Sequence, residues 1–197
     1  MIMNNMFLKI CILFIPVLLS GCVLNSVRSQ PVIISPSALK LFNSTARDGI
    51  VRVVIKGNPF NSDKARLDKL ITDNFKGAYH GHPTDFAILA EPENATDTRI
   101  VVFFLPPKGV SASTICSKPL SVSESEPSRN ANVNQLRAIS ALCREETNLS
   151  WAKIWSDMPQ SIDDPLLISF IKQTARSTIP PSYMQRSNRD CEFVPTC

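Results

Sequence analysis

The stretch from Arg99 to Leu105 constrains the fold most, because it is apolar at five consecutive positions (Ile100, Val101, Val102, Phe103 and Phe104). Side chains of a strand alternate between its two faces, so such a run predicts a strand that is covered on each side. Pro106 and Pro107 end the run, since proline donates no hydrogen bond to a ladder. We therefore expect a central strand of a sheet here.

The segments before this strand predict a strand, a helix and a second strand. Residues 50–56 alternate and end at Gly57, Asn58 and Pro59. A helix is expected over 62–75, with Asn61 as its N-cap and an apolar stripe of Leu67, Leu70, Ile71 and Phe75. Residues 85–90 form the next predicted strand.

After a Ser-rich loop expected over 108–133, residues 136–143 and 149–155 predict a hairpin around Glu145, Glu146, Thr147 and Asn148. A last helix is expected from Asp164, as cap, and Pro165 to the Pro180–Pro181 pair. This element order predicts an α+β fold. We expect a mostly antiparallel sheet of about five strands, with two helices packed on one face and disulfides as staples.

The first 22 residues have the features of an export signal. Lys9 precedes an apolar run from Ile10 to Leu19, which is shorter than the ~20 residues of a membrane-spanning helix. A short membrane anchor and a secretory signal cut elsewhere are the alternatives. The run ends in Leu19-Ser20-Gly21-Cys22, which resembles the lipobox of bacterial lipoproteins.

This resemblance implies cleavage before Cys22, a diacylglyceryl thioether on its sulfur and a third acyl chain on its new amino group. Two or more chains give stable anchoring, so the bilayer is the expected partner of Cys22. In diderm bacteria, the family rule assigns lipoproteins without Asp after the cysteine to the outer membrane. Val23 occupies that position, so the outer membrane is expected rather than the inner membrane.

The resulting organisation has four parts. Residues 1–21 are a cleaved signal peptide, 22–47 the lipidated N-terminus and tether, 48–180 a single α+β domain, and 181–197 a tail closed by a disulfide. Removal of residues 1–21 from the 197-residue chain leaves 176 residues, enough for one domain with a core. Loss of Lys9 lowers the formal net charge from +4 to +3. This charge is too small and too scattered to predict nucleic-acid binding.

Six cysteines are present. Cys11 is lost with the signal and Cys22 is acylated, which leaves Cys116, Cys143, Cys191 and Cys197. An even number in an exported protein favours disulfides, and four cysteines allow three pairings. We favour Cys191 with Cys197 and Cys116 with Cys143. Free buried thiols are the alternative.

His80, His82 and Asp85 form the one close cluster of metal-ligand residue types. The two histidines project to the same side of an extended segment, but the chain contains no other histidine to complete a site. A polar loop is the simpler interpretation, so we assign neither a metal nor a cofactor. No nucleophile elbow, phosphate loop or dinucleotide motif is present, and we assign no catalytic residue.

Trp151 and Trp155 lie on one side of their predicted strand, where core packing and a ligand groove are the two alternatives. Two further stretches, from Arg52 to Phe60 and the series Cys116, Ala141-Leu142-Cys143 and Asp164-Pro165, resemble small bacterial envelope lipoproteins. The resemblance implies no activity and supports the pairing of Cys116 with Cys143. The sequence therefore predicts a non-enzymatic envelope lipoprotein that binds another envelope protein or a cell-wall component. The alternatives are a small hydrolase or metal-binding protein that uses the histidines, and a ligand-binding module that uses the tryptophans.

Overall fold

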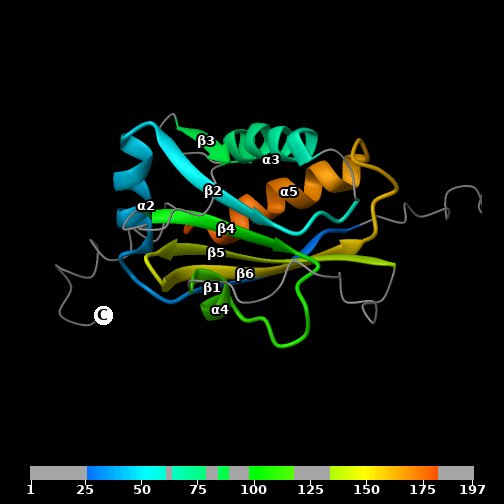
Figure 1. The fold of residues 1–197 in the computed structure, drawn as a ribbon. Helices are drawn as coiled ribbons and strands as arrows, with labels where there is room; N and C mark the ends of the chain where they lie inside the picture. The colour runs from blue at the N-terminus through cyan, green and yellow to red at the C-terminus, as the bar shows by residue number, and fades with distance from the viewer. Residues whose placement is uncertain (1–25, 61–63, 79–83, 89–97, 118–133, 182–197) are drawn as a thin grey trace, which may run out of the picture.

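The computed structural model describes residues 26–60, 64–78, 84–88, 98–117 and 134–181, which form an α+β fold (Figure 1). The strands are β1 (Arg28–Ile33), β2 (Ile50–Lys56), β3 (Asp85–Ile88), β4 (Thr98–Phe104), β5 (Gln135–Arg144) and β6 (Thr147–Asp157). The helices of this described part are α2 (Ala38–Arg47), α3 (Lys64–Ala78), α4 (Ala112–Cys116) and α5 (Pro165–Thr178).

The strands form one mixed sheet in the order β1-β6-β5-β4-β2-β3. Strand β2 runs parallel to both of its neighbours, whereas the pairs β1–β6, β6–β5 and β5–β4 are antiparallel. Helix α3 connects the parallel strands β2 and β3, because parallel neighbours need a long crossover. Strand β4 lies inside the sheet and is buried at every position, which confirms the expected central strand.

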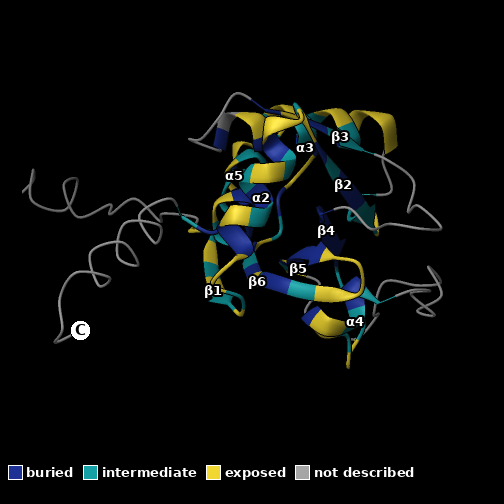
Figure 2. Cartoon of the chain, turned by 90° about the vertical axis from the view of Figure 1, so that its left-hand side faces the viewer, coloured by how far each residue is buried: buried dark blue, intermediate teal, exposed yellow. Residues whose placement is uncertain are grey.

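The two faces of the sheet are covered unequally. Helices α2, α3 and α5 lie on one side and α4 lies on the other (Figure 2). The main core lies under the three longer helices and includes Phe42, Ile71 and Phe170. A second, smaller cluster lies under α4 and includes Val101, Ile115 and Ile139. The short helix α4 covers only part of its face, since five residues rise about 7.5 Å along a helix axis.

The structure corrects three details of the predicted fold. The described sheet has six strands rather than about five, and two of its five pairings are parallel. Three helices rather than two cover the main face, and α4 lies in the segment expected to be a loop. Residues 28–47, expected as a tether, form β1 and α2. Helix α2 belongs to the fold because Ala38, Phe42 and Ala46 are fully buried in the main core.

Several local predictions are confirmed. Strands β5 and β6 form the expected hairpin, but its turn is shorter than expected, because Thr147 and Asn148 pair with Arg144 and Cys143 and only two residues remain in the turn. Pro165 opens α5, and Asp164 caps it because its carboxylate accepts a hydrogen bond from the Leu166 backbone at 2.9 Å. The predicted helix over 62–75 is α3, and Asn61 lies outside the described residues.

Gly57 closes β2 against the end of β4. Its φ is +76°, and a Cβ atom built there would lie 2.6 Å from the carbonyl oxygen of Phe104. Both the backbone angle and the close approach therefore require glycine at this position. The close contact holds the end of β2 against the place where the chain leaves β4, beside the pocket described below.

Candidate binding face

The predicted histidine cluster is only partly within the structure. His80 and His82 lie outside the described residues, and Asp85 is exposed at the start of β3. The Asp85 carboxylate accepts a hydrogen bond from Lys76 Nζ at 2.5 Å, and this bond together with the charge of Asp85 raises the pKa of Lys76. Asp85 therefore has an ion-pair partner on α3. Among the described residues, no three His, Cys, Asp or Glu side chains are grouped to hold a metal. A metal site at the histidines stays the untested alternative to the polar loop, and zinc or copper retained after dialysis and lost in His82→Ala would support it.

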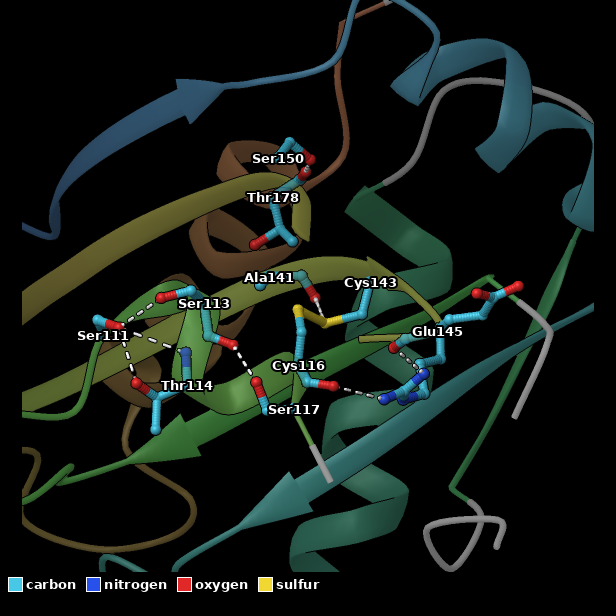
Figure 3. The surroundings of a disulfide bond; sticks show 11 residues. Ser111, Ser113, Thr114, Cys116, Ser117, Ala141, Cys143, Glu145, Ser150 and Thr178 are labelled. Atoms are coloured by element: carbon cyan, nitrogen blue, oxygen red, sulfur yellow. Dashed lines mark hydrogen bonds between the residues drawn. A yellow bond between two sulfur atoms is a disulfide. The ribbon is translucent and has the colours of Figure 1, made fainter. Parts of the chain in front are cut away.

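The expected disulfide between Cys116 and Cys143 is present, with the two Cα atoms 5.6 Å apart (Figure 3). It joins the last residue of α4 to β5, as predicted for a clip between the Ser-rich segment and a strand. Cys191 and Cys197 lie outside the described residues, so their pairing stays a prediction. The bond fixes α4 on the smaller-core face.

Arg99 provides a second connection beside the disulfide. It is fully buried in β4 and pairs directly with Cys143 of β5. Its Nη2 donates to the carbonyl oxygen of Cys116 at 3.0 Å, and its Nη1 donates to that of Glu145 at 2.9 Å. One guanidinium thus links the end of α4 to the β5–β6 turn. Sequence reasoning missed this role, although an arginine at the end of a fully apolar strand is a signal for a buried, hydrogen-bonded cation.

The two tryptophans lie on the α4 face but in different surroundings. Trp151 is half-buried and packs against the small cluster under α4, and Lys153 Nζ lies 5.7 Å from its ring centroid. Trp155 is also half-buried, but it lines an open pocket. The sequence left core packing and a ligand groove as alternatives for both tryptophans. Core packing describes Trp151, whereas the ligand groove is the alternative that suits Trp155.

The pocket lies on the α4 face of the sheet, outside the part that α4 covers, and has a volume of about 420 Å³. Its walls come from the segment after β4 and from β5 and β6 (Pro106, Pro107, Lys108, Val110, Arg137, Ala138, Ile139, Lys153, Ile154 and Trp155). The backbone N–H of Leu105 donates to the Arg137 carbonyl at 2.8 Å, which holds this segment against β5. A positive φ of 47° at Leu105 turns the chain out of β4 to form the wall. The pocket therefore has a defined shape.

The polar groups of this pocket are dominated by cations. Lys108, Arg137 and Lys153 line it and are exposed to solvent, and among the described residues no carboxylate lines it. Apolar atoms of Ile139, Trp155 and the two prolines form the remaining surface. A pocket with an aromatic wall and three cations suits an anionic group carried on a larger molecule.

In the part of the chain that the structure describes, no helix combines the length and the apolar character that crossing a bilayer requires. No protein-family model matches the chain. No curated protein matches it either. Solved structures similar to it include two forms of the PelC dodecamer from Paraburkholderia phytofirmans. A single-substitution variant is 13% identical over 79% of this chain and 100% of that chain, with a TM-score of 0.42. A second PelC structure is 10% identical over 79% of this chain and 99% of that one, with a TM-score of 0.39. At these values the likeness carries no argument about function.

Proposed function

We propose that this chain is a lipid-anchored protein of the bacterial envelope, acylated on Cys22 and held at the outer membrane. The lipobox sequence from Leu19 to Cys22 supports the anchor. The Cys116–Cys143 disulfide supports export, because such bonds persist in oxidising compartments and are rare in the cytosol.

We propose further that the folded part is a binding module without catalytic activity, which recognises another envelope protein or a cell-wall component. One observation carries this proposal. The pocket on the α4 face combines Trp155 with three exposed cations, and no carboxylate of the described part of the chain lines it. The hydrogen bond from the Leu105 backbone N–H to the Arg137 carbonyl holds the wall segment against β5, so the pocket is formed before any partner binds. A rigid surface of this kind is typical of recognition.

The anchor is tested by metabolic labelling with a palmitate analogue. Label is expected on the wild-type chain and absent from Cys22→Ser. Persistent label in that variant would refute acylation at this residue. Replacement of Cys11 by serine is the matched control, since Cys11 precedes the cleavage site and is expected to leave labelling unchanged.

The binding role is tested by crosslinking in intact envelopes, with a photoreactive residue at position 108 and, as control, at position 40. Both positions carry exposed lysines, the first at the pocket and the second on α2 of the opposite side. A defined adduct from position 108 alone is expected. Equal adducts from both positions, or none from position 108, would refute binding through this face.

A further inference from the structure

The pocket lies at the end of the sheet where the folded chain begins. In the strand register, Trp155 of β6 lies between Arg28 of β1 and Arg137 of β5. Directly opposed residues of antiparallel strands share one face of a sheet, so these three side chains belong to the α4 face. The start of β1 and the arrowhead of β6 lie together at the right of Figure 1. Arg28 therefore adds a fourth cation beside the three that line the pocket.

The same register limits how far the pocket lies from the anchor. Arg28 lies six positions after Cys22 along the chain. Because an extended chain spans at most about 3.3–3.6 Å per residue, this linker reaches no more than roughly 20 Å. Because β1 pairs with β6 from Arg28 onward, the end of the sheet that carries the pocket is separated from the anchored cysteine only by this short linker. This step rests on the proposed acylation of Cys22.

We propose that this end of the α4 face docks on the bilayer that holds the anchor, with the anionic phosphate of a lipid headgroup in the pocket. Lys108, Arg137 and Lys153 would supply the charged donors, since arginine and lysine are the residues that proteins use for phosphate. Trp155 has the amphipathic ring that is enriched at headgroup depth, where one end is wet and the other apolar. Arg28, at the rim, adds attraction to an anionic surface.

Charge and position together favour a lipid headgroup over a soluble anion. Asp157 lies two residues beyond Trp155 and so on the same face of β6, but it does not line the pocket. Among the described residues, four cations against one acid leave this end of the face positive. A short linker keeps it near headgroups at high local concentration, a condition that no soluble anion shares. Docking would also restrict the orientation of the domain, which acyl chains alone leave free.

The chain provides its own probe for this proposal, because Trp151 and Trp155 are its two tryptophans and both lie on the α4 face. The acylated full chain is reconstituted into vesicles of phosphatidylglycerol or of phosphatidylcholine, each carrying a nitroxide on a fraction of the headgroups. Quenching of tryptophan emission reports contact between this face and the headgroups. Strong quenching is expected in phosphatidylglycerol and weak quenching in phosphatidylcholine. A Trp151→Phe variant, with Trp155 as its single tryptophan, is expected to keep the effect.

The decisive variant is the double charge reversal Arg137→Glu with Lys153→Glu. It is expected to lower the ratio of docked to undocked chain on the order of tenfold or more in phosphatidylglycerol. The matched control is Lys40→Glu with Arg47→Glu on α2, which changes the net charge equally on the opposite side. Both control residues are exposed, and the control is expected to quench as the wild type does. Circular dichroism of each variant, unchanged from wild type, establishes that folding is intact.

Three results would overturn the proposal. The first is absence of quenching in anchored wild-type chain, and the second is equal loss of quenching in the two double variants. The third is a change of tryptophan emission with inorganic phosphate in neutral micelles as large as that with phosphatidylglycerol, which would assign the pocket to a soluble anion. An alkaline wash distinguishes failure of the anchor from failure of docking. Docking is measured first, by quenching at low salt. Removal of the chain from the vesicles in the later wash would refute acylation.

Discussion

Replacing Cys116 and Cys143 together by alanine is expected to lower the free energy of unfolding by a calculable amount. The disulfide closes a segment with a sequence separation of 27 residues. In the chain-entropy model, opening a loop of this length costs roughly 3.5 kcal/mol at 25 °C. For a domain of this size each kcal/mol corresponds to about 2–4 °C in the unfolding midpoint, so the midpoint is expected to fall by about 7–14 °C.

The measurement is urea unfolding of the purified chain, followed by tryptophan emission with and without reductant. Reduction is expected to destabilise the wild type to the level of the reduced double alanine variant and to affect that variant much less, since it retains only the predicted Cys191–Cys197 bond. Peptide mapping without reductant first verifies that Cys116 and Cys143 are joined in the oxidised sample. A loss below about 1 kcal/mol, or an equal effect of reductant on both proteins, would refute the argument from loop closure.

Further substitutions test three other parts of the fold, by the same urea assay unless another is named. Gly57→Ala is expected to lower the free energy of unfolding by about 2 kcal/mol and Gly49→Ala by about 1 kcal/mol, because both glycines have a positive φ but only Gly57 lacks space for a Cβ. An equal loss in the two variants would contradict this. Arg99→Met is expected to lower the free energy of unfolding by about 3 kcal/mol, since the buried Cys116 carbonyl and the partly buried Glu145 carbonyl lose a charged donor; a change within error would contradict it. Asp164→Ala is expected to cost about 1 kcal/mol as a lost cap. The backbone N–H groups of Gln160 and Leu166 lower the pKa of Asp164. The stability that the Asp164 carboxylate contributes is therefore present above its unfolded pKa of about 4, and it is lost as the pH falls through the lower folded pKa. Asp164→Asn keeps an acceptor oxygen but does not titrate, so it is expected to remove this pH dependence in acid unfolding.

The elements that the sequence predicts well are those with local signals. The run from Ile100 to Phe104 identified the central strand, and Asp164 with Pro165 identified the start of α5. The turn at Glu145 joined two alternating segments into the β5–β6 hairpin. In each case the signal lies within a few residues of the structure that it determines.

The elements that the sequence missed depend on distant contacts. Strand β1 contains Pro31 and several exposed residues, so it lacks the pattern of a buried strand, and its pairing with β6 makes it one. The parallel pairing of β2 with β4 joins strands separated by a helix and another strand, which periodicity does not encode. Helix α4 has only five residues, and its position is fixed by the disulfide and by the carbonyl group of Cys116.

The candidate site illustrates the same division. The spacing of Trp151 and Trp155 was visible in the sequence, and both lie on the face that it implied. That only Trp155 lines a pocket was not visible, because the other walls come from β5 and from the segment after β4. Arg137 and Lys153 come together through the antiparallel register of β5 and β6, and Lys108 joins them because the chain turns sharply at Leu105. The cationic character of the pocket is thus a product of strand order. It explains how a chain whose small net charge is scattered along its sequence presents a locally positive surface at the sheet end where β1 begins, the end nearest in sequence to the proposed anchor at Cys22.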